Sequence, residues 1–412
     1  MDYLYIILNA FRHLFNIQSY ALFCAFVIGI IFSNERKTVT SICKATDNSK
    51  YWSMIKFLSR SKWNADALAI TLIKLIQSTI KDWVYVYDET YSIKTGKSQF
   101  GLHFFPNHKY NSKGKNQSKY HWGHQFAALG ILSVCLNQAV LFPVWVKMIV
   151  PGDAMFNSLA VLTTIMSNIS SGLIIFDRGF NNRKVFKIVI EHGHNLLCRA
   201  KSNAVFYFPV EQKAKRGRPR KYGKRLDITT MNFRHIDFNG QILEVADAIV
   251  YTKMCPQQVR LVVRRTFSKK TNTYKYFSVY TTDLNLPIEK ILFYYRLRWE
   301  QETAFRDSKQ SFGFDEYQVK SSTSISRFVQ LSFVAISVMQ MFFNQSIIYN
   351  AETYNVDRII ETLGIHWYKP SKLTRGLMQA YLRYLLFRQL FSCSKVTLSE
   401  QTKIHEPLSK VI

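Results

Sequence analysis

Apolar residues recur at helical spacing through residues 1–80. After Asn64, whose side chain can cap the first turn of a helix, apolar residues recur at Leu68, Ile70, Leu72, Leu75 and Ile76. This pattern predicts a helix after Asn64. Together with the apolar stretches before it, the pattern predicts a small all-helical domain.

One uncharged stretch, residues 17–34, raises the question of a membrane span. Its strongly apolar part, from Tyr20 to Phe32, has thirteen residues, whereas a helix needs about 20 to cross a bilayer. The chain also begins without the basic region of a secretion signal. We therefore expect a buried helix here and no membrane partner.

The pattern changes to β-branched and aromatic runs after residue 80. Residues 83–87 (WVYVY) form one such run and residues 172–177 (GLIIFD) another, and an aspartate ends each of them. Further strands are predicted at 124–134, 139–150 and 195–203, and helices at 153–169 and 181–193. Alternation of this kind is typical of an α/β domain.

Strand patterns dominate residues 204–286. The segment 241–253 precedes a hairpin whose strands are 259–267 and 275–283. Helical spacing returns at 287–312 and continues beyond it. A β-rich insertion therefore separates two parts of the chain that have mixed or helical patterns.

Composition and charge narrow the class of partner. Of the 412 residues, 48% are hydrophobic, and 55 Lys and Arg face 27 acidic residues, a formal net charge of +28. This charge favours a polyanion as the binding partner, with nucleic acid as the first candidate and an anionic membrane surface as the second.

The six scattered cysteines include no CxxC pair, which favours buried free thiols in a reducing compartment. Zinc-site spacing is also absent from the histidines His103, His108, His121 and His124.

One helical segment carries a distinctive set of polar side chains. Tyr295, Arg298, Glu302 and Lys309 stand at offsets 0, 3, 7 and 14. At about 100° per residue these positions fall within about 60° of one another on a helix. A solvated helix does not need this alignment, but a site that handles a polyanion and a cation does.

Carboxylates stand at positions that suit a metal site. Asp88 and Asp177 each follow an apolar strand, and Glu302 lies on the later helix. Hard divalent cations prefer oxygen ligands, and two Mg²⁺ ions about 4 Å apart promote phosphodiester chemistry. An aspartate after a strand is also a common turn former, so neither aspartate is a strong signal alone.

Taken together, these residues resemble the DDE transposases of bacterial insertion sequences. The helix shows the Y-R-E-K signature typical of insertion sequence family four and its relatives. Residues 88–90 (DET) resemble the family's first aspartate motif and residues 176–180 (FDRGF) its second. Residues 57–63 (FLSRSKW) resemble the end of its N-terminal helical domain. The resemblance covers nearly the whole chain in the right order.

The resemblance implies an α/β fold of the ribonuclease H-like type, with a mixed sheet and flanking helices, interrupted by a β-rich insertion, plus an N-terminal helical domain. The implied domains are a helical DNA-binding domain (1–80), the first part of the catalytic core (81–203), the insertion with a basic loop (204–286), the second part of the core (287–345) and a C-terminal helical region (346–412).

The implied activity is metal-dependent cleavage and transfer of DNA strands in cut-and-paste transposition. Asp88, Asp177 and Glu302 would hold two Mg²⁺ ions, with Mn²⁺ as the alternative. Residues 204–286 contain no Trp, on which some family members stack a flipped base, so a hairpin intermediate is left open.

The resemblance also implies the DNA contacts. Arg298 and Lys309 would clamp phosphates, and Tyr295 would position the DNA backbone near the cut. The partner would be double-stranded DNA, both the terminal inverted repeats and the target. The protein would form a homodimer on DNA, and it would be cytoplasmic and associated with the nucleoid when bound.

A strongly basic segment, residues 213–225 (KAKRGRPRKYGKR), holds eight basic residues in thirteen. Its RGRP core resembles an AT-hook, in which Arg216, Arg218 and Arg220 would meet the narrow minor groove of A·T-rich DNA. The alternative is a solvated loop that contacts phosphates without sequence preference. Either way, the segment is expected to bind DNA.

The sequence also bears on two rival functions. A haloacid-type phosphatase would need an aspartate where Thr90 stands. A catalytically inactive or decayed DNA-binding protein of the same fold would keep the positive charge but lose an acid, and all three acids are present. An active transposase is therefore the favoured interpretation.

Overall fold

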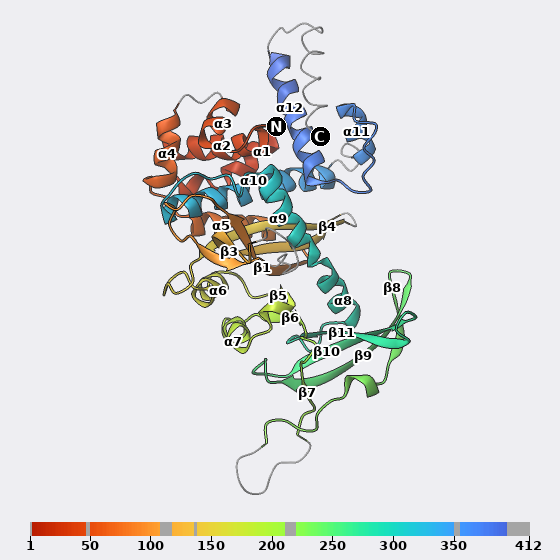
Figure 1. The fold of residues 1–412 in the computed structure, drawn as a ribbon. Coiled ribbons are helices and arrows are strands. Elements are labelled where there is room, and N and C mark those ends of the chain that lie inside the picture. The colour runs from red at the N-terminus through yellow and green to blue at the C-terminus, as the bar shows by residue number, and fades with distance from the viewer. Residues whose placement is uncertain are drawn as a thin grey trace. The chain divides into compact units, whose positions relative to one another are not determined.

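The computed structural model describes residues 2–46, 50–107, 118–135, 138–210, 220–349 and 355–393. The chain forms two compact units (Figure 1). The first unit comprises Met1–Trp83, Glu89–Pro151 and Gln301–Ile412, and the second comprises Val84–Asp88 and Gly152–Glu300. Strand β1 (Trp83–Ile93) gives residues to both units.

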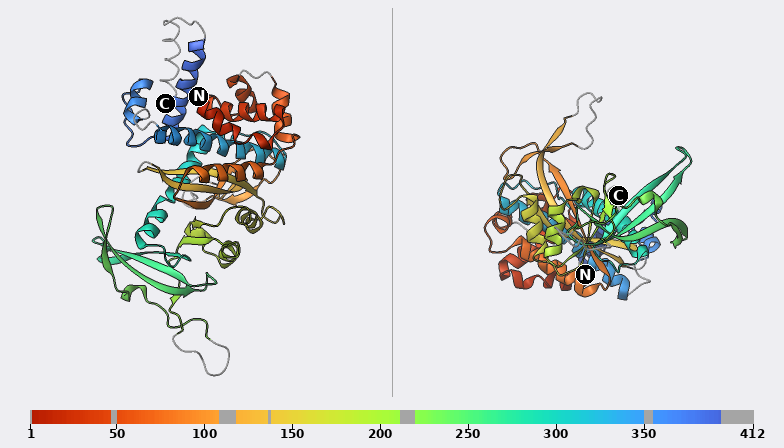
Figure 2. Two further views of the ribbon diagram at one scale, coloured as in Figure 1. Left: turned by 180° about the vertical axis from the view of Figure 1, so that it is seen from behind. Right: turned by 90° about the horizontal axis from the view of Figure 1, so that it is seen from below.

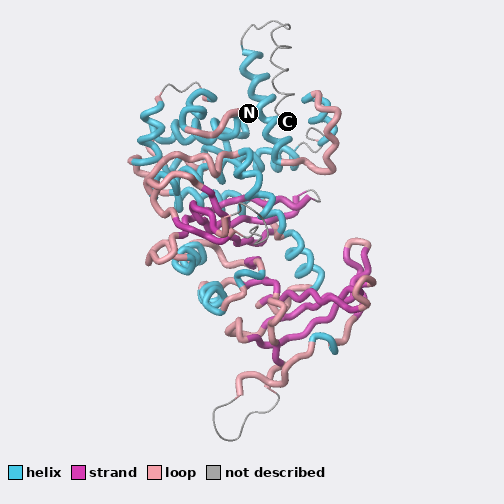
Figure 3. Tube along the Cα trace, in the orientation of Figure 1, coloured by secondary structure: helices cyan, strands magenta, loops and turns pink. Residues whose placement is uncertain are grey.

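The first unit is mainly helical, with an antiparallel group of strands (Figure 3). Its helices are α1 (Asp2–Asn9), α2 (Ile17–Phe32), α3 (Val39–Ala45), α4 (Tyr51–Ser59), α5 (Ala65–Thr79), most of α9 (Trp299–Ser311), α10 (Ser322–Tyr349), α11 (Val356–Leu363) and α12 (Arg375–Cys393). Its strands are β2 (His103–Pro106), β3 (Tyr120–Cys135) and β4 (Gln138–Ile149), and β3 pairs with both β2 and β4.

Side-chain caps define the beginnings of the N-terminal helices. The side chain of Asn64 accepts a hydrogen bond from the Asp66 backbone N–H, which confirms the predicted start of α5. Asn16 caps α2 in the same way, through the backbone N–H of Ser19. These caps satisfy donors that the first turn of a helix leaves without partners.

Helix α10 forms the centre of the first unit. Its polar side chains bond to the backbone of β4: Gln330 bonds with the Val146 N–H and the Val144 carbonyl, and Ser337 donates to the Pro143 carbonyl. The segment Ser322–Asn344 is long and apolar enough to cross a membrane, and the sequence analysis did not single it out. In this structure 94% of its most apolar window is buried inside the protein, as in the core helix of a soluble protein.

The C-terminal helix α12 completes the end of α2. Gln379 and Arg383 both donate hydrogen bonds to the Ile31 carbonyl, and Arg383 also donates to the Ser33 carbonyl. The last carbonyls of a helix have no partners within the helix. Side chains about 350 positions later in the chain therefore satisfy these groups of α2.

The second unit contains a mixed sheet with helices beside it (Figures 1 and 2). Its parallel part consists of Val84–Asp88 of β1, β5 (Leu173–Phe176) and β6 (Asn195–Arg199). Its antiparallel part continues from β6 through β11 (Thr273–Thr281) and β10 (Val259–Ser268) to β9 (Gln241–Thr252), which also pairs with β7 (Phe206–Tyr207) and β8 (Arg234–Phe238). The helices are α6 (Ser158–Met166), α7 (Arg183–Glu191) and α8 (Ile288–Leu297).

This mixed α/β arrangement is consistent with the expected ribonuclease H-like fold. The predicted hairpin is present as β10 and β11. The helix expected over residues 287–312 was wrong in one respect, because α8 ends at Leu297 and α9 begins at Trp299. Between them, the Arg298 N–H bonds to the carbonyl of Tyr295, three residues back rather than four, so the turn is tighter there. The short strand β2 was not predicted.

A buried histidine gives the first unit a testable response to acid. His124 is fully buried, its Nε2 donates to the Phe100 carbonyl, and its Nδ1 accepts from the Tyr317 hydroxyl. Burial lowers the pKa of His124 from 6.5 to about 4. The neutral ring therefore contributes stability that is present above pH 6.5 and is lost as the pH falls from there towards 4, because only the unfolded chain gains the proton.

We expect His124→Gln to lose less stability than the wild type between about pH 7 and pH 5. The difference between the two losses should be on the order of 1–2 kcal/mol. Urea unfolding at both pH values measures it, with the exposed His235→Gln as the control. Equal losses in the wild type and His124→Gln would contradict the assignment of a neutral buried ring.

Candidate active site

Two aspartates lie where the parallel pairing of β1 and β5 ends in the second unit. Asp177 directly follows β5, as predicted, but Asp88 lies within β1, which continues to Ile93, so the expectation that Asp88 ends a strand was wrong. Strands β1 and β5 pair in register up to Tyr87 and Phe176, and Asp88 and Asp177 are the next residues on each strand. The rings of Tyr87 and Phe176 lie 5.6 Å apart, and both contact Phe180. These ring contacts pack together the residues that directly precede Asp88 and Asp177.

The guanidinium of Arg298 contacts both carboxylates. Its Nη1 lies 3.4 Å from Oδ2 of Asp88 and its Nη2 lies 3.8 Å from Oδ1 of Asp177. The side chain of Arg298 is 13% exposed, whereas those of Asp88 and Asp177 are 19% and 43% exposed. A nearly buried cation therefore offsets the charge of two carboxylates that solvent can still reach.

Tyr295 stands one turn before Arg298 and faces the same aspartate. Its hydroxyl donates to Oδ1 of Asp177 over 3.5 Å, and its ring lies 5.6 Å from that of Phe277. Burial raises the pKa of the Tyr295 phenol, and the charge of Asp177 adds to the effect while Arg298 opposes it. The phenol is therefore protonated at neutral pH and acts as a hydrogen-bond donor.

Two arginines that the sequence analysis missed lie beside this group. The guanidinium groups of Arg199 and Arg264 lie 5.0 and 5.3 Å from the centre of the Phe277 ring, the same ring that contacts Tyr295. The only sequence signal was the placement of basic residues among the apolar positions of β6 and β10.

A buried thiol contacts the backbone of Asp177. Cys198 pairs with Phe176 across β6 and β5, and its Sγ lies 3.4 Å from the Asp177 backbone carbonyl. Burial raises the pKa of the thiol, and the charge of Asp177 reinforces that effect. Cys198 is therefore a neutral donor and adds no further negative charge.

The structure thus brings together Asp88, Asp177, Tyr295 and Arg298. Glu302 follows Arg298 by four residues and belongs to the first unit.

Lys309, also in the first unit, donates from Nζ to the Tyr91 carbonyl over 2.6 Å. Burial lowers its pKa, and the carboxylate of Asp315 opposes that effect. Its ammonium is therefore held by the protein's own backbone in this structure.

The donor chemistry of the two aspartates suits a hard divalent ion, which prefers carboxylate oxygen. Their positions on adjacent strands let both carboxylates address the same ion. Among the residues that the structure describes, no group of three His, Cys, Asp or Glu side chains lies close enough to hold a metal ion. The two carboxylates alone could therefore provide only part of a ligand set, and the cation that contacts both of them in this structure is Arg298.

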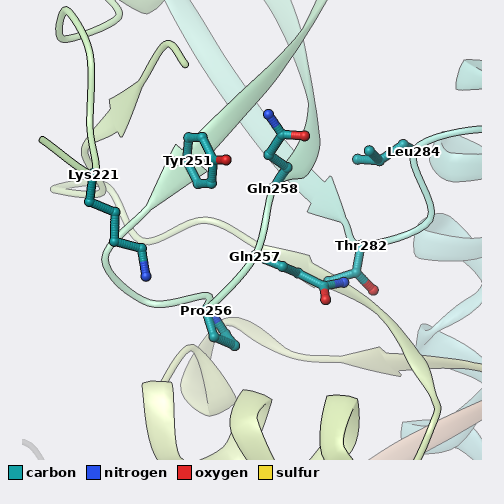
Figure 4. Close-up of a pocket in the computed structure, with 7 residues that line it drawn as sticks. All are labelled: Lys221, Tyr251, Pro256, Gln257, Gln258, Thr282 and Leu284. Carbon is teal, nitrogen blue, oxygen red and sulfur yellow. The ribbon is translucent and has the colours of Figure 1, made fainter. Parts of the chain in front are cut away.

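The basic segment is only partly described. Arg216 and Arg218 lie outside the described residues, and Arg220 is exposed. Just after it, Lys221 lines an open cavity of about 520 Å³ (Figure 4). The other lining residues are Tyr251, Pro256, Gln257, Gln258, Thr282 and Leu284, and none of them is a predicted site residue.

Comparison with known proteins places these features in a family. A family model described as "Transposase DDE domain" matches residues 84–338, well over half of the chain. A second model, described as "DDE superfamily endonuclease", matches residues 13–152. A search of curated proteins finds no match.

The shared arginine gives a prediction about stability. Arg298→Ala removes the cation between two carboxylates, so it should lower the midpoint of thermal unfolding, with a loss of about 1–3 kcal/mol. Adding Asp88→Asn to Arg298→Ala should recover part of the loss, because it removes one of the repelling charges. Lys290→Ala is the control, since Lys290 is an exposed cation on the preceding helix α8. An Arg298→Ala protein as stable as this control would contradict the shared-cation interpretation.

Proposed function

This chain belongs to the transposase DDE domain family, and on that premise we propose that it cuts and joins DNA strands in the transposition of an insertion sequence. The observation that carries the proposal is the pair of aspartates where the pairing of β1 and β5 ends, with Arg298 in contact with both. DDE enzymes generally use divalent metal ions, and the family acts on DNA.

The proposed subgroup is insertion sequence family four. Its support is the Y-R-E-K spacing of Tyr295, Arg298, Glu302 and Lys309. Two members of this set, Tyr295 and Arg298, contact the aspartate pair. An arbitrary helix would not place both of these side chains on Asp177.

In the proposed mechanism, Asp88, Asp177 and Glu302 would hold two Mg²⁺ ions, or Mn²⁺ as the alternative. When bound, the ions would activate the attacking oxygen and stabilise the leaving oxygen of a phosphodiester.

The chain's own residues bind and orient the DNA. Arg298 offers a fixed guanidinium to a phosphate that approaches the carboxylates, and it offsets their repulsion of that phosphate. Tyr295 carries a protonated phenol that can donate to a phosphate oxygen. Lys309 would contribute its charge to a phosphate after leaving the Tyr91 carbonyl.

The proposed substrates are the terminal inverted repeats of the element and a target duplex. The net charge of +28 supports tight, salt-dependent binding to both. A homodimer on DNA and a cytoplasmic, nucleoid-associated location complete the proposal.

Replacing Glu302 tests the catalytic role. Glu302→Gln should abolish cleavage of a labelled duplex that carries the element's own end, because a neutral amide is a poor ligand for Mg²⁺. Binding to that duplex should remain, since the net charge changes by only one of +28. Gel assays of cleavage and of binding measure the two effects. Glu289→Gln, an exposed position on α8, is the control and should cut normally. A Glu302→Gln protein that still cuts would remove Glu302 from the ligand set.

The basic segment gives a prediction about salt dependence. Replacing Arg216, Arg218 and Arg220 with Ala should weaken DNA binding, and each lost phosphate contact should lower the slope of log K against log salt by about 0.9. A larger loss on A·T-rich than on G·C-rich DNA would identify a minor-groove reader, and equal losses a phosphate clamp. Titrations at several salt concentrations measure both. Unchanged binding on either DNA would show that the segment does not contact DNA.

A further inference from the structure

An outward-facing aromatic surface lies on the two-stranded ribbon of β2 and the start of β3, within the first unit. Phe104 pairs with Trp122 and Pro106 with Tyr120 across the two strands. Side chains alternate between the faces of a strand, so Phe104, Tyr120 and Trp122 share one face. We call these three residues the ribbon face. Phe104 is 69% exposed and Tyr120 is 48% exposed.

The opposite side of the ribbon is anchored to the first unit. Phe105 is buried and stacks on Tyr91 at 4.4 Å, and its ring also contacts His121. The chain also approaches closely at Gly123, where a Cβ would collide with the carbonyl oxygen of Ser92. Because these contacts fix one side, the ribbon face is held towards solvent. The right-hand view of Figure 2 shows the ribbon extending from the helices of its unit.

The rings of the ribbon face are oriented before any partner arrives. The indole N–H of Trp122 donates to the Gly96 carbonyl over 2.9 Å. The ring centres of Phe104 and Trp122 lie 4.7 Å apart at an interplanar angle of 55°. A partner that stacks on these rings would therefore bind side chains that are already ordered, which lowers the entropic cost of binding.

The surroundings of the ribbon face are positive. The ammonium of Lys119 lies 5.7 Å from the centre of the Tyr120 ring, and Lys97, next to Gly96, is exposed. The sequence has no acidic residue between positions 91 and 152. A second copy of this chain would bring like charges to the same place, so charge complementarity favours an anionic partner.

We propose that the ribbon face binds unpaired DNA bases, such as those of a strand that opens beside a cut end. Aromatic rings stack on bases of any sequence, and lysines beside them neutralise the phosphates. An intact duplex hides the faces of its bases, so the occupant is a single-stranded or opened segment. That the polyanion is DNA rests on the proposed function, whereas the stacking rests on the geometry of the rings.

The experiment measures the binding of two fluorescent probes to the full chain. One probe is an oligothymidine strand of about 16 nucleotides, a length within the site sizes of stacking proteins, and the other is a duplex of the same length. Phe104→Ala/Tyr120→Ala should weaken binding of the strand about tenfold or more and change duplex binding less than twofold. Phe104→Tyr/Tyr120→Phe, which keeps both rings, should bind the strand as the wild type does. Trp367→Ala, an exposed aromatic position elsewhere in the first unit, should leave both affinities unchanged.

A stacking readout separates this role from a structural one. A 2-aminopurine base in the strand loses fluorescence when it stacks, so the wild type should quench it and the double alanine variant should not. Wild-type affinity and quenching in the alanine variant would overturn the proposal. So would an equal loss of strand and duplex binding, or a loss of dimer in sedimentation with strand binding intact, which would identify a second copy as the occupant. A wild type that binds and cuts duplex ends but not the strand would refute only the ribbon face, whereas one that binds no DNA would refute the proposed function as well.

Discussion

The carboxylates of Asp88 and Asp177, where the parallel pairing of β1 and β5 ends, repel each other, and the group of side chains around them depends on a cation that offsets this repulsion. Two like charges about 5 Å apart repel by on the order of 3 kcal/mol at an effective dielectric of about 20, and exposure to solvent reduces that energy. The Arg298 guanidinium, which touches both Asp88 and Asp177, offsets this energy. In the proposed function, the same cation would also reduce the repulsion between the carboxylates and a phosphate of the DNA.

Arg298 also lies at the break between two helices. The tight turn at Arg298 separates α8 from α9, and α8 places Tyr295 against Asp177 and Phe277. The antiparallel strand β11 supplies Phe277. The β-rich part of the second unit therefore contributes a side chain, Phe277, to the group around the aspartates.

Local signals in the sequence predicted much of this unit but not its contacts. The apolar strands before Asp88 and Asp177 were evident because buried parallel strands appear as continuous apolar runs. The break at Arg298 was not, because a hydrogen bond to a carbonyl three residues back leaves no mark on periodicity. Nor could spacing show that Lys309 bonds to Tyr91, or that Arg199 and Arg264 meet at Phe277, since those contacts join distant segments. The roles of the Y-R-E-K residues in DNA binding and catalysis stay predictions.

The hydrogen bonds from α12 to the end of α2 have a consequence for the order in which the protein can form during synthesis. The Ile31 and Ser33 carbonyls are made early, but Gln379 and Arg383 follow only about 350 residues later. At roughly 5–20 residues per second, the wait on the ribosome is roughly 20–70 s. Throughout that interval the apolar helices of the first unit lack their last covering element. Apolar surface exposed for that long during translation is prone to aggregate, and chaperones act on surface of this kind.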